Sequence, residues 1–374
     1  MRQFHLLCLA GLLLLGSCGG KFFPPDTDNS GGGGSTTSGN YLYVANSSTT
    51  VSSIAGFTIA NSALNNLSNS PYAVGLPPNA LAITPNDTFL YSGSFSGGIY
   101  AYTINSGGSL SVALSGSPAA TGVSPVTMKV DPTGQWLIVA DLTPAVYVFG
   151  INASTGALTP QGNAVGLDPG TTTDLYVTPN GQYVFISLGT GGVDLLTFNS
   201  SSGSITKLNS ILNPTVSGYA DQGLASDPNS KYLFVAETGV NAVRVLSINA
   251  TGTLLTELAT SPVKTGLGPS QVLVTASGSY VYVTNRTDGT VSGFALSANG
   301  ALTPLTGSPY TTGSAPVDIA EDKTGTYIAV ACANGNPDLQ VFSIDTTSPG
   351  KLDTFASTTT GTDPTLASAV VATK

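Results

Sequence analysis

The chain has 374 residues, of which only 8% are charged, and its formal net charge is −9 at pH 7. A weakly charged, acidic chain without a basic run argues against nucleic-acid binding and against binding of the folded domain to anionic lipids. Its length allows a core large enough to be stable without disulfides.

The beginning of the chain predicts a targeting signal followed by a tether. Residues 1–17 carry Arg2 and the apolar run Leu6–Leu15, and small residues precede Cys18. This pattern resembles a bacterial lipoprotein signal, cut before Cys18 and lipidated there, and an ordinary secretory signal with an incidental cysteine is the alternative. Residues 18–40 are rich in Gly and Ser and predict a flexible tether. We therefore expect a membrane-attached protein of the bacterial cell envelope, outside the cytoplasm, in the periplasm or at the cell surface.

The signal contains the only histidine, His5, and the first cysteine, Cys8. The mature chain then lacks histidine, which excludes Ser-His-Asp and Cys-His catalysis as well as His-ligated zinc. With Cys18 lipidated, Cys332 stays alone and no disulfide is expected. A buried, unreactive thiol is the favoured interpretation of Cys332, because no His or Arg motif flanks it.

From residue 41 onward one aromatic-led apolar phrase occurs seven times, at intervals of 47 to 49 residues. The copies are Tyr41–Asn46, Phe89–Ser94, Trp136–Asp141, Tyr183–Leu188, Tyr232–Glu237, Tyr280–Asn285 and Tyr327–Cys332. Such a period, in units that each hold four short segments rich in β-formers between turn residues, is the signature of a β-propeller. Residues 41–374 are thus predicted to form an all-β, seven-bladed β-propeller with four antiparallel strands per blade.

The first unit lacks an innermost strand, because a Gly/Ser tract precedes Tyr41. The segment Asp363–Val371 resembles the phrase that begins the innermost strand in the other units. We therefore expect the C-terminal strand to complete the first blade, with Leu366 at the position that Asp174 occupies in the fourth. Closure of the ring removes two exposed sheet edges.

Polar residues at aligned positions of the innermost strands predict a site at the mouth of the central channel. Asp174, Gln271 and Asp318 share one position, and Lys129 and Tyr176 share the position two residues deeper. Two carboxylates and an amide could coordinate Ca²⁺, although no metal motif occurs in the chain. The alternative is that these groups bind loop amides or channel water.

Arg286 lies on a loop of the same face and completes the set of candidate ligand-binding residues. A solvated pair with Asp288 in a turn is its alternative interpretation. The count of carboxylates on this face indicates an acidic rim, which would favour a cationic, neutral or basic ligand over an anionic one.

The strand phrases Tyr41–Asn46 and Tyr280–Asn285, the turn Asp131–Gly134 and the phrase Gly300–Leu305 resemble the lactonase and YVTN-repeat seven-bladed propellers. This resemblance covers the chain from Tyr41 to its end. It implies lactone chemistry of the 6-phosphogluconolactonase kind. Without histidine, lactone hydrolysis could use a carboxylate as general base and a cation that stabilises the oxyanion.

The residues of the mature domain do not decide between binding and catalysis. The mature domain has two arginines and no motif onto which the family's substrate-binding His and Arg residues can be placed. We therefore expect a monomeric surface module that binds a small molecule, a glycan or a protein on the channel face without efficient catalysis. A lactone hydrolase that uses rim carboxylates is the alternative, and the fold does not decide between them.

Overall fold

The computed structural model describes residues 39–48, 52–60, 62–208, 220–249, 254–360 and 366–374. The predicted signal, Cys18, most of the tether and Asp363 lie outside the described residues. No helix in the described part of the chain is long and apolar enough to cross a membrane.

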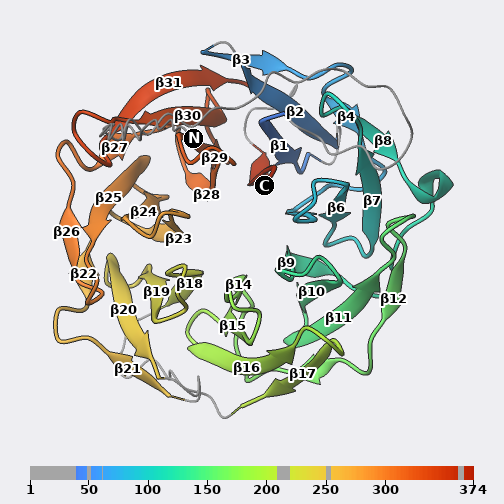
Figure 1. Cartoon of the computed structure of the whole chain (residues 1–374), viewed down its shortest axis with the longest axis horizontal. Coiled ribbons are helices and arrows are strands. Elements are labelled where there is room, and N and C mark those ends of the chain that lie inside the picture. The colour runs from blue at the N-terminus through green and yellow to red at the C-terminus, as the bar shows by residue number, and fades with distance from the viewer. Residues whose placement is uncertain (1–38, 49–51, 61, 209–219, 250–253, 361–365) are drawn as a thin grey trace, which may run out of the picture. The chain divides into compact units, whose positions relative to one another are not determined.

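The described residues form seven antiparallel sheets, which are the blades of a propeller (Figure 1). Blade 1 consists of β32 (Ala367–Ala372), β1 (Tyr41–Asn46), β2 (Ser53–Ala60), β3 (Ala63–Asn66) and the short β4 (Tyr72–Ala73). Blade 2 consists of β5 (Ala80–Ile83), β6 (Phe89–Gly93), β7 (Ile99–Ile104) and β8 (Leu110–Val112), followed by the 3-10 helix η1 (Leu114–Gly116). Blade 3 consists of β9 (Pro125–Val130), β10 (Trp136–Asp141), β11 (Ala145–Ile151), β12 (Leu158–Pro160) and β13 (Val165–Gly166). Blade 4 consists of β14 (Asp174–Val177), β15 (Tyr183–Ser187), β16 (Val193–Asn199) and β17 (Ser204–Lys207).

The remaining blades repeat the same order from the channel outward. Blade 5 consists of β18 (Asp221–Ser226), β19 (Tyr232–Glu237), β20 (Ala242–Ile248), β21 (Leu255–Glu257) and β22 (Val263–Lys264). Blade 6 consists of β23 (Pro269–Val274), β24 (Tyr280–Asn285), β25 (Thr290–Leu296), β26 (Leu302–Pro304) and β27 (Tyr310–Thr311). Blade 7 consists of β28 (Pro316–Glu321), β29 (Tyr327–Cys332), β30 (Leu339–Ile344) and β31 (Leu352–Thr358). The predicted all-β, seven-bladed propeller is confirmed.

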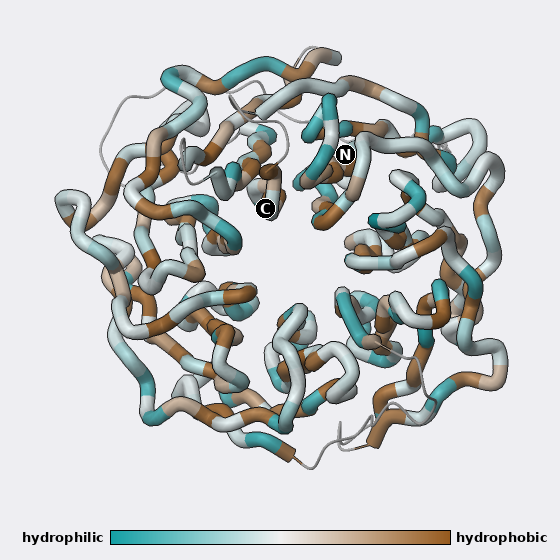
Figure 2. Tube along the Cα trace, turned by 180° about the vertical axis from the view of Figure 1, so that it is seen from behind, coloured by the Kyte–Doolittle hydropathy of each residue, from teal (hydrophilic) through white to brown (hydrophobic). Residues whose placement is uncertain are grey.

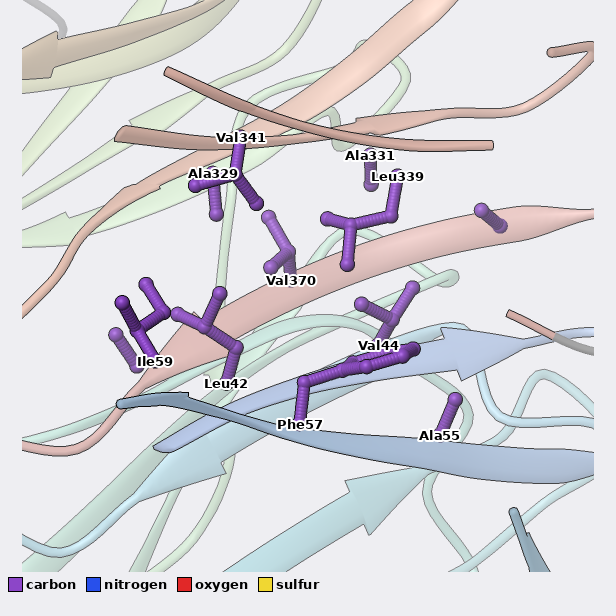
Figure 3. Close-up of a cluster of buried hydrophobic side chains, with 12 residues drawn as sticks. Leu42, Val44, Ala55, Phe57, Ile59, Ala329, Ala331, Leu339, Val341 and Val370 are labelled. Carbon is purple, nitrogen blue, oxygen red and sulfur yellow. The ribbon is translucent and has the colours of Figure 1, made fainter. Parts of the chain in front are cut away.

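The C-terminal strand completes blade 1, as predicted, because β32 pairs antiparallel with β1. Beyond β32, the Lys374 N–H donates to the Asp87 carboxylate of blade 2 at 2.7 Å. A cluster of buried apolar side chains joins blade 1 to blade 7, with Val370 of β32 between the two (Figure 3). The ring is therefore closed by hydrogen bonds on one side of β32 and by apolar packing on the other.

The register of the closing strand differs from the expectation. Val370 pairs with Val44, whereas the equivalent pair in blade 4 is Leu175 with Ile186. Ala369, and not Leu366, therefore occupies the position of Asp174. A bulge follows between Ala45 and Asn46, where blades 3, 6 and 7 also have one. An alanine-rich strand has too little pattern for its register to be read from the sequence.

The repeated aromatic phrase holds neighbouring blades together at the face where the innermost strands end. A Cβ atom added to Gly108 of blade 2 would lie 2.6 Å from the ring of Tyr41 in blade 1. The hydroxyl of Tyr43 donates to the Gly108 carbonyl at 2.6 Å. Tyr91 and Tyr282 form the same bond with the next blade, so the Tyr-x-Tyr pattern reports contacts between blades. Figure 2 shows the hydrophobic stretches that recur in every blade.

Candidate functional site

The seven innermost strands line the central channel, and each contributes one residue at the level of Asp174. In the order of the blades these residues are Ala369, Ala80, Thr127, Asp174, Gly223, Gln271 and Asp318. Asp174, Gln271 and Asp318 thus share one level of the channel, near the face where the innermost strands begin, which we call the upper face. Their shared position agrees with the alignment of the innermost strands in the sequence. The three side chains nevertheless make different hydrogen bonds.

Asp174 is buried, and its carboxylate is fully used by hydrogen bonds. It accepts from the backbone N–H of Leu175 at 2.8 Å and of Leu224 in blade 5 at 2.9 Å. The hydroxyl of Thr127 in blade 3 also donates to it, at 3.4 Å, and so does the side-chain amide of Gln271. Burial raises the pKa of Asp174, and these bonds together with the charge of Lys129 oppose that rise.

Gln271 reaches Asp174 because the blade between them has no side chain at this level. A Cβ atom added to Gly223 would lie 2.1 Å from Gln271 Oε1. That oxygen accepts from the Val272 N–H at 2.9 Å. Asp174 and Gln271 are therefore tied to blades 3 to 6, which supports the structural alternative for this pair over a ligand-binding role.

Asp318 occupies the same position in blade 7 and is only half-buried. It accepts from the N–H of Ile319 at 2.9 Å and from the N–H of Val370 in the closing strand at 2.8 Å. The channel walls remove most bulk water from the carboxyl group, and the nearby Asp174 adds repulsion. Together they raise the pKa of Asp318 to about 6, against the opposing charge of Lys129. Each Asp318 oxygen accepts one of these two bonds and keeps a further lone pair.

Lys129 and Tyr176 lie one layer deeper in the channel, as predicted from their spacing. Lys129 is half-buried and makes no hydrogen bond or ion pair with another described residue. Its charge acts on both Asp174 and Asp318. The Tyr176 hydroxyl donates to the Ser226 carbonyl at 3.4 Å, and burial raises the pKa of Tyr176. Lys129 is therefore a donor that the fold itself leaves available.

Arg286 is exposed on the loop after β24 at the upper face. Its guanidinium makes no hydrogen bond or ion pair with a described residue, so the alternative of a pair with Asp288 is not realised there. Asp288 instead accepts from the Leu267 N–H at 2.6 Å. The structure does not link Arg286 to the channel group of Asp318 and Lys129.

The rim is less acidic than the count of carboxylates implies, because several of them are buried inside the loops. Asp141 accepts from the Ser124 N–H at 2.6 Å, and Asp338 binds both the N–H and the hydroxyl of Thr360 at 2.7 Å. Burial, followed by the neighbouring Asp221, raises the pKa of Glu237, while Arg244 opposes that rise and binds the Glu237 carboxyl group at 3.2 Å. These carboxyl groups hold loops and present little charge to a ligand.

Sequence reasoning missed a ring of polar side chains one residue before the channel level. Each donates to a backbone carbonyl at the start of the next innermost strand. They are Asn79 to Pro125 at 2.6 Å, Thr173 to Asp221 at 3.0 Å, Ser270 to Pro316 at 2.9 Å and Ser368 to Pro78 at 2.9 Å. A recurrent Asn, Thr or Ser before the aligned position was the available signal. These bonds fasten the blades and are not a binding site.

Of the channel residues considered as Ca²⁺ ligands, Asp174 has the least available oxygens. Calcium takes six to eight oxygen ligands, whereas the Asp174 oxygens are occupied by four donors. The described residues also contain no group of three or more His, Cys, Asp or Glu side chains placed to hold a metal. Cys332 is buried in a strand, and burial raises the pKa of its thiol to about 11.

Several known proteins share this architecture. A protein from Lactobacillus plantarum is 23% identical with a TM-score of 0.73, over 90% of this chain and 99% of that chain. A candidate 6-phosphogluconolactonase from Bacteroides fragilis is 18% identical with a TM-score of 0.71, over 91% and 100%. The periplasmic gluconolactonase of Pseudomonas aeruginosa is also 18% identical with a TM-score of 0.71, over 90% and 99%.

These similarities establish the fold, and the sequence identifies the family. No curated protein matches the sequence. The model of the family described as "Lactonase, 7-bladed beta-propeller" matches residues 77–369, which include six blades and the first half of the closing strand. The chain therefore belongs to the lactonase family of seven-bladed β-propellers.

Proposed function

We propose that the protein is a lipid-anchored, extracytoplasmic binding module that takes a small, uncharged, hydroxyl-rich molecule in the upper part of its channel. The supporting observation is the pair of Lys129 and Asp318. Lys129 is a donor without a partner among the described residues, and Asp318 is a half-buried acceptor with free lone pairs. Such a pair matches a ligand that carries both a carbonyl or ether oxygen and hydroxyl groups.

The same geometry argues for binding over efficient turnover. Asp174, the other channel carboxylate, is saturated by donors from its own fold. The mature chain offers no histidine, and Arg286 lies outside the channel group. One carboxylate and one lysine can fix a ligand, whereas acyl transfer also requires oriented donors for the oxyanion.

Lactone hydrolysis remains the second candidate because of one specific observation. The pKa of Asp318 is raised to about 6, which places it close to the working range of a general base at neutral pH. In such a reaction Asp318 would accept a proton from water while Lys129 stabilises the oxyanion. The gluconolactonase from Pseudomonas aeruginosa and the candidate lactonase from Bacteroides fragilis share only the fold at this level of identity.

Titration calorimetry of the full-length protein with D-glucose and with D-glucono-1,5-lactone tests the proposal. We expect saturable binding that weakens at least about tenfold in Lys129→Met, since a charged donor bond contributes roughly 1.5 to 3 kcal/mol. Lys231→Met is the matched control, because Lys231 is an exposed lysine at a turn far from the channel level in its blade. The absence of binding, or equal losses in both variants, would refute the channel site.

A lactone-hydrolysis assay on the same samples separates the two candidates. The binding module predicts hydrolysis at the spontaneous rate in both the wild type and Asp318→Asn. Hydrolysis well above that rate, lost in Asp318→Asn while binding persists, would replace the binding proposal by the enzyme.

The membrane anchor belongs to the same proposal and rests on the sequence before and at Cys18. Cys18→Ala should move the protein from the membrane fraction to the soluble fraction of its host without changing its melting temperature. A Cys18→Ala variant that stays in the membrane fraction would contradict lipidation at this residue.

A further inference from the structure

Two carboxyl groups lie against each other at the start of the innermost strand of blade 5. Asp221 of β18 pairs with Glu237 of β19, and both side chains are fully buried. No N–H or hydroxyl of a described residue donates to the Asp221 carboxyl group. Its hydrogen-bond partner is the Glu237 carboxyl group. Because a bond between two carboxyl groups needs a proton on one of them, the pair holds a proton.

Other blades have no second carboxyl group at this place. The position of Asp221 is proline in blades 3, 6 and 7, opposite Asp141, Asn285 and Cys332. In blade 3 the carboxylate of Asp141 accepts from the Ser124 N–H at 2.6 Å and faces no other carboxylate across the strand pair. The geometry of a blade therefore does not require an acid at the position of Asp221.

A single cation, Arg244, faces the pair. Its Nη1 lies 3.2 Å from Glu237 Oε1, and its Nη2 lies 2.9 Å from Oε2 of the exposed Glu257. With one proton on the pair, the buried groups Asp221, Glu237 and Arg244 are together neutral. Loss of that proton leaves a net negative charge among groups that have no contact with water, which is costly.

The charges that act on the pair come from blade 5 itself. Burial raises the pKa of Asp221 and of Glu237, Asp221 adds to the rise for Glu237, and Arg244 opposes it for both. Among the described residues of blade 4, the Thr173 hydroxyl and the Gly189 carbonyl contact Asp221, and neither titrates. The two carboxyl groups therefore titrate together, as a pair.

The pair lies where blade 5 is fastened to blade 4. The Thr173 hydroxyl donates to the Asp221 carbonyl at 3.0 Å, and the Asp221 N–H donates to the Gly189 carbonyl at 3.1 Å. Three residues further along β18, the Leu224 N–H binds Asp174 in the channel. A displacement of the beginning of β18 would therefore loosen the contact between the blades and the upper part of the channel together.

We propose that Asp221 and Glu237 form a proton-dependent latch between blades 4 and 5. The latch is closed while the two carboxyl groups share a proton. When the proton passes to solvent, repulsion between the two carboxylates separates the beginning of β18 from blade 4, and water reaches Asp221. The latch responds to pH alone and does not depend on the ligand proposed for the channel.

The melting temperature of the full-length protein tests the titration of the pair. Because the folded pair has raised pKa values, the unfolded chain loses these protons first, and the contribution of the pair to stability falls as the pH rises above about 4. In Asp221→Asn the side-chain amide can donate to Glu237 without titrating. The wild type should therefore lose at least about 2 °C relative to Asp221→Asn between pH 5 and pH 9, which corresponds to one pKa unit in a domain of this size.

Asp353→Asn is the matched control, because Asp353 is a half-exposed aspartate on β31 of blade 7. Its melting temperature should follow that of the wild type at every pH. Parallel curves for the wild type and Asp221→Asn would overturn the proposal. If Asp221→Asn does not fold, Glu237→Gln removes the pair from the other side, and a wild-type pH dependence in Glu237→Gln would equally overturn it.

Amide hydrogen exchange measured by mass spectrometry tests the opening itself. After correction for the intrinsic rate at each pH, exchange of Asp221–Ser226 should accelerate several-fold from pH 5 to pH 9 in the wild type and stay constant in Asp221→Asn. The strand Pro269–Val274 of blade 6, which has proline in place of the acid, is the internal reference. A difference in melting temperature without faster exchange of Asp221–Ser226 would show that the pair ionises in place and that no latch opens.

Discussion

Blades 4 and 7 carry an aspartate at the same channel position, but the two carboxylates differ in burial and in hydrogen bonding. Asp174 is 4% exposed and accepts from four donors, whereas Asp318 is half-buried and accepts from two backbone amides. Both Asp174 and Asp318 accept an N–H of the following blade. The difference arises from the other blades: Thr127 of the preceding blade and Gln271 two blades further on donate to Asp174, whereas Ala80 holds the position two blades beyond Asp318. In this ring the neighbours decide whether a channel carboxylate is structural or free.

Of the changes proposed here, removal of the closing strand should have the largest effect on the stability of the fold. A chain that ends before Pro364 loses the partner of β1, the Val370 amide that binds Asp318, and the apolar packing of Val370. Two sheet edges become exposed. We expect no soluble, cooperatively folding protein, as measured by circular dichroism during thermal unfolding. A truncated protein that melts like the full chain would show that closure by β32 is dispensable.

Replacement of each of the two aspartates by alanine should lower the free energy of unfolding by different amounts. Asp174→Ala leaves the Leu224 N–H and the Gln271 amide without an acceptor inside the protein, and we expect a loss of about 3 kcal/mol in the free energy of unfolding. Asp318→Ala leaves the Val370 N–H near channel water, and about 1 kcal/mol is expected. Urea denaturation of both variants measures the difference. Equal losses, or a larger loss for Asp318→Ala, would overturn the assignment of structural and free carboxylates.

Gly223→Ala probes the link between Asp174 and Gln271 directly. The added methyl group would lie 2.1 Å from Gln271 Oε1, 2.4 Å from Gln271 Cα and 2.8 Å from the Ser270 carbonyl oxygen, so the backbone of blade 6 must shift as well as the Gln271 side chain. We expect a loss of about 1 to 3 kcal/mol in the free energy of unfolding. Gln271→Ala alone should cost less, and the double variant should cost less than the sum because the part of the clash that involves the Gln271 side chain is relieved, while the clash with the backbone stays. Strict additivity in this cycle would show that Gly223 does not serve Gln271.

The period of the aromatic phrase was enough to predict the fold, because every blade repeats the same packing of residues such as Tyr41 against glycine in the next blade. The level of Asp174, Gln271 and Asp318 was predictable for the same reason. Their hydrogen bonds were not, since they depend on the absence of a side chain at Gly223 one blade away. The register of the closing strand was also missed, because its alanines and valines pair equally well at several offsets.

We also predict a pH dependence of stability to which Asp318 contributes from the channel. Its pKa is raised in the folded protein, to about 6, above the ordinary value of 3.8 for an aspartate. Below pH 4 the group is protonated in both states, and between pH 4 and 6 the unfolded chain ionises first, so this group's contribution to stability falls as the pH rises. Asp318→Asn removes that slope. Melting temperatures of wild type and Asp318→Asn should therefore converge at pH 4 and separate in favour of the variant by pH 7. If the melting temperature of the wild type instead rises relative to that of the variant as the pH rises, the charge of Lys129 and the two amide donors stabilise the ionised carboxylate more than burial destabilises it. Asp318 would then be held in its charged form as firmly as a structural carboxylate.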